Sequence, residues 1–254
     1  MTISIKSQEA IECMRQAGRA ASAAREAAGA AVAPGVTTAE IDAVVRDTLK
    51  QFGAEPSFLN YHGYPAAVCV SLNEEVIHGI PSKKRVIHRG DLVKIDVGAK
   101  LHGYHGDTAA TFHAGGIPES AQKLIDVTRQ SFFEALKVCV SGKRISDISR
   151  AVQTYAEGHG FSVVKAFTGH GIGTEMHEDP SVPNYIERHH DDDYVNPRLV
   201  PGMTIAIEPM INAGTCAVKV LSDKWTVVTI DKKLSAHYEH TVLITNGEPE
   251  ILTR

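Results

Sequence analysis

The chain has few cysteines, and they form no recognisable motif. Its 254 residues include only four, and these are far apart in the sequence: Cys13, Cys69, Cys139 and Cys216. This spacing excludes a C-x-x-C redox or zinc pair, and also the dense disulfide framework of a small secreted scaffold. A reducing compartment is expected. Because the first residues lack the charged and apolar segments of a signal peptide, we expect a cytoplasmic protein.

Long segments of a single character are also absent. No basic block is longer than Lys83-Lys84-Arg85 and the formal net charge is -4, which argues against nucleic acid and anionic membranes as partners. No apolar run approaches the roughly 18 residues of a membrane span. With 43% apolar residues, the composition is that of a globular protein with a sizeable core. No coiled-coil or repeat-array pattern demands assembly, so a monomer is expected.

Several catalytic signatures are missing. The sequence contains no H-E-x-x-H zinc motif, no G-x-S-x-G nucleophile elbow and no recognisable catalytic cysteine signature. Its glycine spacing matches neither G-x-G-x-x-G nor the phosphate-binding P-loop. Catalytic chemistry must therefore be sought in other polar residues.

The residues that are present indicate an internal duplication. An Ala-rich segment at residues 8–31 predicts a helix, and the capping-box pattern Thr37-x-x-Glu40 predicts the start of a second. Related residues recur 107 positions later, where Gly142, Ile148, Val152 and Gly160 correspond to Gly35, Ile41, Val45 and Gly53. We expect one catalytic domain over residues 1–254, with pseudo-symmetric halves at approximately 1–115 and 116–254.

Four segments rich in β-branched and aromatic residues predict antiparallel strands: 92–98, 104–112, 204–208 and 239–245. A turn at residues 100–103 would pair Gly98 with His105 and Asp96 with Asp107. Two carboxylates about 5 Å apart across a strand pair destabilise the sheet unless a cation neutralises them. The polar segment 187–193 is expected to be a surface loop.

Acidic residues in both halves predict a metal site. Asp96 and Asp107 lie in the first pair of strands, and Glu208 and Glu239 lie in the second pair. Any one of them alone could be a solvent-facing residue, but four in matching positions favour a shared role. His170, between Gly169 and Gly171, is the best-placed imidazole, although a histidine in a flexible glycine loop is the alternative.

This donor set suits Mn, Fe(II), Co or Zn. Carboxylates that bridge two divalent ions hold them about 3.5–4 Å apart, and such a pair activates a bridging water as a nucleophile. Metal-assisted hydrolysis is therefore the chemistry that the residues favour.

The sequence resembles the methionine aminopeptidases, in particular their short type I form, over nearly its whole length. The motifs that carry the resemblance are Tyr61-His62-Gly63-Tyr64-Pro65, His78-Gly79-Ile80-Pro81, Lys94-Ile95-Asp96-Val97-Gly98, Gly106-Asp107-Thr108-Ala109, Gly169-His170-Gly171-Ile172-Gly173, Ile207-Glu208-Pro209-Met210 and Tyr238-Glu239-His240-Thr241. The resemblance implies an α+β pita-bread fold, in which two pseudo-symmetric halves surround a curved antiparallel sheet with helices on its outer face.

The resemblance also implies a role for each residue of the site. Asp107 and Glu239 would bridge two divalent metal ions, Asp96 would hold one ion, and His170 with Glu208 would complete the other. Glu208 would also be the general base. His177 would stabilise the tetrahedral oxyanion and His78 would contact the substrate near its scissile amide.

An apolar pocket for a methionine side chain is implied at Tyr61, Tyr64, Cys69 and Trp225, because a thioether packs well on aromatic rings. Aromatic residues at such positions can also be ordinary core residues. Two positions depart from the expected pattern: Phe58 stands where a small or thiol residue is expected, and Met176 where a bulkier aromatic is expected.

The expected activity is removal of the initiator methionine from peptides and nascent proteins, which leaves the ribosome open as a partner. A proline-specific aminopeptidase of the same fold is one alternative, and a metal-free amidinohydrolase is another. A non-catalytic relative that binds peptides or ribosomes is a third.

Overall fold

The computed structural model describes residues 2–186 and 196–254, and the predicted loop at 187–193 therefore lies outside the described residues. The helices are α1 (Gln8–Ala30), α2 (Thr38–Gln51), α3 (Glu119–Val138) and α4 (Ile145–Gly158), with a 3-10 turn η1 (Tyr61–Gly63). The strands are β1 (Glu55–Pro56), β2 (Cys69–Leu72), β3 (Glu75–Ile77), β4 (Leu92–Leu101), β5 (Tyr104–His113), β6 (Ser162–Val163), β7 (Gly169–Gly171), β8 (Glu178–Val182), β9 (Thr204–Ile207), β10 (Met210–Asn212), β11 (Val218–Val220), β12 (Val227–Thr229), β13 (Ser235–His237), β14 (Glu239–Leu243) and β15 (Glu250–Ile251).

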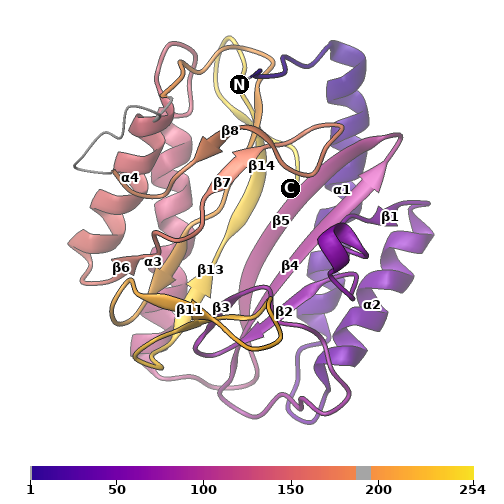
Figure 1. Cartoon of the computed structure of the whole chain (residues 1–254), viewed down its shortest axis with the longest axis vertical. Helices are drawn as coiled ribbons and strands as arrows, with labels where there is room; N and C mark the ends of the chain where they lie inside the picture. Colours follow the sequence, from indigo (N-terminus) through magenta and orange to yellow (C-terminus); the bar gives the residue numbers. More distant parts are fainter. Residues whose placement is uncertain (1, 187–195) are drawn as a thin grey trace.

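Among the described residues, the largest sheet has nine strands, all antiparallel to their neighbours. Its order is β1-β4-β5-β14-β9-β7-β8, with β2 also paired to β4 and β15 to β14. Strands β4 and β5 come from the first predicted half, whereas β14, β9 and β7 come from the second, so the two halves share one sheet (Figure 1). Two small sheets, β13-β10-β6 and β11-β12-β3, complete the strands.

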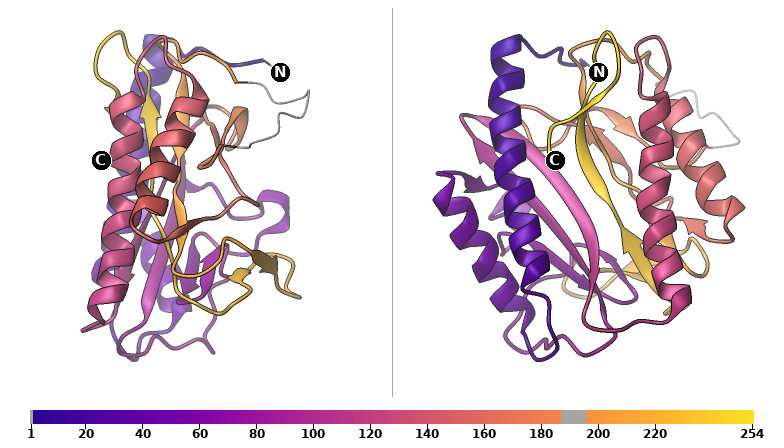
Figure 2. Two further views of the ribbon diagram at one scale, coloured as in Figure 1. Left: turned by 90° about the vertical axis from the view of Figure 1, so that its left-hand side faces the viewer. Right: turned by 180° about the vertical axis from the view of Figure 1, so that it is seen from behind.

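The helices lie on one face of the large sheet, as the side view in Figure 2 shows. Helices α1 and α2 pack on the strands of the first half, and α3 packs with α4 on those of the second. The predicted helices and the α+β arrangement with helices on the outer face are confirmed. None of the helices in residues 2–186 and 196–254 has the length and apolar character that crossing a membrane requires.

Helices α2 and α4 correspond residue for residue at the predicted offset of 107 positions. At the start of each helix an acidic side chain accepts from the backbone N–H of the N-cap residue, Glu40 from Thr37 and Asp147 from Arg144, and each helix has a left-handed glycine two residues after its end. The φ values of these glycines, Gly53 and Gly160, are 67° and 87°, a conformation that glycine adopts without steric cost. This correspondence supports the duplication, which stays a prediction.

The predicted register of β4 and β5 was wrong by two residues. Gly98 pairs with Asp107 and Asp96 pairs with Ala109. The turn consists of His102 and Gly103 alone, both with positive φ (52° and 81°), because a two-residue turn of this kind matches the twist of the flanking strands. Asp107 is therefore diagonal to Asp96 rather than opposite it, and still on the same face of the sheet.

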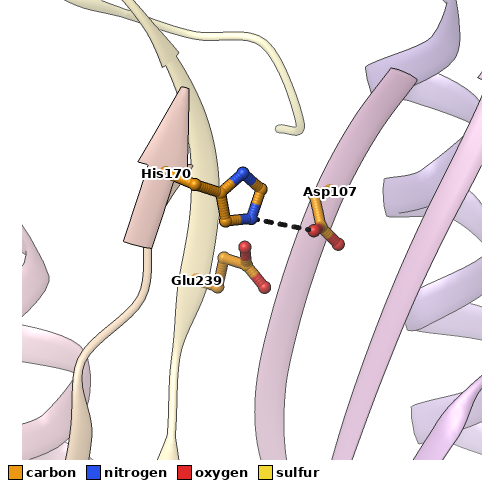
Figure 3. A group of neighbouring side chains, drawn as sticks. All are labelled: Asp107, His170 and Glu239. Carbon is orange, nitrogen blue, oxygen red and sulfur yellow. Dashed lines mark ion pairs between the residues drawn. The ribbon is translucent and has the colours of Figure 1, made fainter. Parts of the chain in front are cut away.

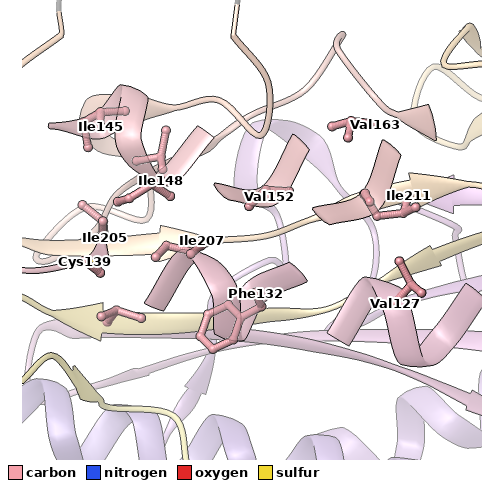
Figure 4. Packing of buried hydrophobic residues seen from close by; sticks show 14 of the residues in the cluster. Val127, Phe132, Cys139, Ile145, Ile148, Val152, Val163, Ile205, Ile207 and Ile211 are labelled. Carbon is pink, nitrogen blue, oxygen red and sulfur yellow. The ribbon is translucent and has the colours of Figure 1, made fainter. Parts of the chain in front are cut away.

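Buried apolar side chains form a large cluster under each pair of helices. The cluster under α3 and α4 includes Phe132 and Ile148 from the helices and Ile205 and Ile207 from β9 (Figure 4). The cluster under α1 and α2 is rich in alanine on the α1 side. Small side chains there allow α1 to approach the sheet closely.

Asp107 points away from α1, because the residue before it, Gly106, packs against that helix. A Cβ added to Gly106 would lie 2.7 Å from the backbone nitrogen of Gly18, so position 106 faces α1. Because successive side chains in a strand point to opposite faces, Asp107 faces the side of the sheet without helices.

Candidate metal centre

A cavity of about 460 Å³ lies on the helix-free side of the sheet and collects the predicted site residues. Its lining consists of Phe58, Tyr61, His62, Tyr64, Cys69, His78, Asp96, Asp107, His170, Met176, His177, Glu208, Trp225 and Glu239. All the residues that the sequence predicted for metal, catalysis and substrate are in this set, and His62 is the one addition.

Three of these residues come together from three strands. Asp107 on β5, His170 on β7 and Glu239 on β14 each offer a ligand atom, and these atoms lie within 4.8 Å of one another. His170 Nε2 is 3.7 Å from Asp107 Oδ2 (Figure 3). The sheet order explains the cluster, because β14 lies directly beside β5 and only β9 separates it from β7.

Glu208 and Asp96 extend the cluster on two sides. Glu208 follows directly after β9, and its Oε1 is 3.6 Å from His170 Nε2. Burial raises the pKa of Asp107 well above its ordinary range, and the charges of Asp96 and Glu208 raise it further. The predicted ligands therefore form one group of interacting charges.

The unpaired atoms of this group fit divalent cations. Within the described part of the chain, Asp96 Oδ1, Asp107 Oδ1 and Glu239 Oε1 are buried without a hydrogen-bond partner. Burial raises the pKa of Asp96 to about 7, and burial with mutual repulsion raises the pKa of Glu208 and Glu239 well above the ordinary range. Buried carboxylates without donors are costly unless a cation compensates their charge.

His170 is prepared as a nitrogen ligand. Burial, with the nearby charge of His177, lowers its pKa to about 3, so the ring is neutral. Its Nδ1 is 2.8 Å from the carbonyl oxygen of Gly171 and donates to it, which leaves the lone pair on Nε2, the atom that faces the carboxylates.

The glycines beside His170 are required by strand packing. A Cβ on Gly169 would lie 2.3 Å from the carbonyl oxygen of Ala206, and one on Gly171 would lie 2.1 Å from that of Asp179. The neighbouring strands β8 and β9 therefore leave no room for a side chain on either side of His170. The glycine motif is part of the sheet and not the flexible loop that was the alternative.

Two further histidines border the cluster. His177 Nδ1 is 2.7 Å from the hydroxyl of Tyr61, and its ring centroid is 4.2 Å from that of His170. Burial lowers the pKa of His78 to about 4, and burial also lowers the pKa of His177. Both rings are therefore neutral near pH 7, and each offers one N–H donor.

Apolar side chains form the other wall of the cavity. The rings of Tyr64 and Trp225 meet edge to face at 5.1 Å. The Tyr64 hydroxyl lies 3.1 and 3.0 Å from the carbonyls of Val68 and Gly79, so its polar end is bonded within the protein. Cys69 is buried beside them, and Phe58 and Met176 contribute to the same cavity.

Sequence reasoning missed two histidines. His62 lines the cavity, and its charge lowers the pKa of His177. His237 is fully buried, with Nε2 3.7 Å from Glu208 Oε2. Its position two residues before Glu239 was the available signal, because alternate residues of an extended chain point to the same side.

Comparison with known proteins decides the family. The model of metallopeptidase family M24 matches residues 12–246. The chain belongs to metallopeptidase family M24. As an M24 member it is a peptide-bond hydrolase that uses divalent metal.

Relatives of this M24 chain match it along its whole length. It is 52% identical to the methionine aminopeptidase of Clostridium acetobutylicum over 99% of this chain and 98% of the relative. The crystal structure of methionine aminopeptidase from Thermotoga maritima has a TM-score of 0.94 at 42% identity and full coverage of both chains. The prolidase of Pyrococcus furiosus has a TM-score of 0.77 at 27% identity, over 98% of this chain and 65% of that one. The α+β pita-bread fold is thereby confirmed.

Proposed function

We propose that this M24 metallopeptidase removes the N-terminal methionine from peptides and nascent proteins. The observation that carries the proposal is that the carboxylate cluster and the apolar wall of Tyr64, Cys69 and Trp225 line the same cavity. A hydrolytic centre beside a pocket for one apolar side chain is what an aminopeptidase for methionine requires. Full-length similarity to enzymes named methionine aminopeptidase supports the same reading.

The ligand set proposed for two divalent ions is Asp96, Asp107, His170, Glu208 and Glu239. Asp107 and Glu239 are central in the cluster and would bridge the ions, with Asp96 on one side and His170 with Glu208 on the other. When bound, Mn, Fe(II), Co or Zn would polarise the scissile carbonyl and make a water more acidic.

Glu208 is assigned as the general base. Its pKa is raised by burial and by the charge of Asp96, and such a carboxyl group can accept a proton and hold it until the leaving amine needs it. Its Oε2 has His237 as a neighbour at 3.7 Å, on the side away from His170.

His177 and His78 are assigned to the reacting amide. If Tyr61 donates its hydroxyl proton to His177 Nδ1, the ring carries its own proton on Nε2, where it can donate to a developing oxyanion. His78 has positive φ (60°) and its ring stands edge to face against Phe167 and Trp225. This packing fixes the His78 imidazole for contact with the substrate near the scissile amide.

The methionine side chain is assigned to the apolar wall. Its thioether would contact the ring edges of Tyr64 and Trp225 and the buried Cys69, with Tyr61, Phe58 and Met176 completing the pocket. Burial of Cys69 raises the pKa of its thiol, so the thiol stays neutral and the wall has no charge for a charged side chain to pair with.

The cellular setting is part of the same proposal. The four cysteines are unpaired, as is usual in a reducing compartment. We assign the activity to a monomer in the cytoplasm, where nascent chains on the ribosome would supply the substrate.

The test is cleavage of a Met-Gly peptide, a Leu-Gly peptide and a Gly-Pro peptide by metal-free protein titrated with Mn, Co or Fe(II). Asp107→Asn serves as the site variant, and Asp126→Asn on the exposed side of α3 is the matched control. We expect metal-dependent release of methionine, at least tenfold less leucine, and no activity in Asp107→Asn alone.

Two other outcomes would assign other functions. Metal-dependent cleavage of the Gly-Pro peptide alone would keep the metal centre and identify a proline-specific enzyme. No cleavage with any metal by the folded protein would contradict the catalytic proposal and favour a peptide-binding relative.

A further inference from the structure

A second cavity of about 500 Å³ lies on the opposite side of the sheet, between α1 and α3. The view from behind in Figure 2 shows the C-terminal end of the chain between these two helices. Apart from His237, which also lies beside Glu208, none of the residues assigned to the metal centre or to the methionine pocket lines this cavity. Its size is within the range of sites for small organic ligands.

The lining is rich in arginine. Arg25 comes from α1, Arg129 from α3, and Arg254 from the end of the described chain. Glu26 supplies the one carboxylate among the lining side chains, against the three guanidinium groups. Burial and the three arginines lower the pKa of His240 to about 3, so it adds no charge.

Two of these arginines have no anionic partner. Arg25 pairs with Glu26 at 2.6 Å, whereas Arg129 and Arg254 form no ion pair with any carboxylate in the described residues. Arg25 is 7% exposed and forms the deep end of the cavity, while the other two are exposed at its rim. Guanidinium groups that line one cavity can together bind a phosphate or a carboxylate through their N–H donors.

The rest of the lining is apolar. Phe112 from β5, Ile125 and Phe133 from α3, and Ile251 from β15 contribute to the same cavity. The guanidinium of Arg129 lies 5.3 Å from the ring centroid of Phe133. An occupant with an apolar ring and one anionic group would use both parts of the lining.

Hydrogen bonds join this cavity to the metal centre through the sheet. Arg25 Nη1 donates to Thr108 Oγ1, and that hydroxyl donates to the backbone carbonyl of Glu239 at 2.8 Å. Thr108 directly follows Asp107 in the chain, so Thr108 is connected to both residues that are proposed to bridge the metal ions, Asp107 and Glu239. Burial and the neighbouring carboxylates raise the pKa of Glu239, and the positive charge of Arg25 on the other face of the sheet opposes that rise.

We propose that the cavity between α1 and α3 binds a small organic anion, a phosphate or carboxylate attached to an apolar ring, and that its occupancy is coupled to metal binding through Arg25 and Thr108. An anion in the cavity adds negative charge beside Arg25, which is joined to Glu239 through Thr108, and so lowers the positive potential at the metal ligands. The carboxylates then hold a divalent ion more tightly, and linkage requires the metal to tighten anion binding by the same factor. This inference rests on the metal centre assigned under the proposed function, and it does not depend on the proposed specificity for methionine.

The site itself is tested with phenyl phosphate as the probe, titrated into Mn-loaded protein by calorimetry. The double variant Arg129→Gln/Arg254→Gln should weaken binding at least tenfold, while Arg150→Gln, an exposed arginine on α4, should leave it unchanged. Phenol should bind at least tenfold more weakly than phenyl phosphate. Equal binding to wild type and the double variant would mean that the phosphate sits on the metal, and would overturn the proposal, as would the absence of binding.

The coupling has its own measurement. The Mn dissociation constant should be about fivefold or more lower when phenyl phosphate is saturating. Thr108→Val, which keeps the shape but removes the hydroxyl, should retain probe binding and lose this difference. If the Mn affinity of the wild-type protein does not respond to the probe, the coupling is refuted. This outcome does not depend on whether the Thr108 variant folds.

Discussion

His237 Nε2 lies 3.7 Å from Glu208 Oε2, and neither nitrogen of the His237 ring has a hydrogen-bond partner in the described part of the chain. The ring is fully buried, and burial, with the charges of His78 and Lys94, lowers its pKa to about 3. His237 is therefore neutral and has one N–H available. A hydrogen bond between these two atoms would need a separation of about 2.7–3.2 Å. A small side-chain movement would bring His237 and Glu208 within that distance.

The first prediction concerns this pair. His237→Ala should weaken metal binding and lower kcat by roughly 10–100-fold, because partners of metal ligands orient those ligands. His237→Gln, whose amide can also donate, should recover most of the loss, and KM should change little in either variant. Metal titration and Met-Gly cleavage would check this. Equal losses in both variants would indicate a packing role instead.

The second prediction concerns the pH dependence of metal binding. In the metal-free protein the pKa of Asp96 is raised to about 7, so the folded chain holds this proton at pH 6. A divalent ion must displace it, and the apparent affinity should fall as pH falls, by about tenfold per pH unit for each displaced proton. His170 does not contribute above about pH 4, because its own pKa is lowered to about 3.

Calorimetric titration of Mn at pH 6, in buffers with different ionisation enthalpies, counts the released protons. At least one is expected. An affinity that stays constant between pH 8 and pH 6 would show that the carboxylates remain ionised without metal, contrary to this account.

Local sequence signals predicted the helices well and the strand register poorly. The capping box at Thr37 and the apolar spacing of α2 are short-range features, and the helix follows them. The β4–β5 register depended on whether the turn contains two residues or four, which the sequence around His102 and Gly103 did not decide by itself. Backbone twist favoured the shorter turn.

The site was predictable as a set of residues but not as a geometry. The acidic residues stood out because each interrupts an apolar strand, and the family motifs supplied their roles. The position of β14 between β5 and β9 brings Glu239 to Asp107 and His170, and no local pattern encodes that order. The contact of Arg25 with Thr108 across 83 positions was hidden for the same reason.

The third prediction tests the strand packing around His170. Gly169→Ala should lower the free energy of unfolding by about 2 kcal/mol or more, because its Cβ would overlap the Ala206 carbonyl. The displaced strand should also weaken metal binding at least tenfold. Gly158→Ala, at the end of α4 with open space around it, should be neutral or stabilise by up to about 1 kcal/mol. Chemical unfolding and metal titration of both variants provide the comparison.

The fourth prediction concerns Lys94, which is buried on β4 two residues before Asp96. Its Nζ donates to the carbonyls of Asn73 at 2.8 Å and Ser235 at 3.0 Å, and so joins residues that are far apart in the chain. Lys94→Met would leave both carbonyls without this donor, at a cost of about 2–4 kcal/mol. Lys84→Met, at an exposed position, is the matched control.

The sign of the Lys94 effect with pH follows from its pKa, which burial lowers from 10.5 to about 7. Between these values the unfolded chain binds the proton more than the folded chain does, so this group makes the folded state more stable as pH rises. Lys94→Met should therefore be more destabilising at pH 9 than at pH 7 in urea unfolding of the metal-loaded protein. A difference that stays constant between pH 7 and pH 9 would mean that the buried ammonium stays charged, held by the carbonyls of Asn73 and Ser235.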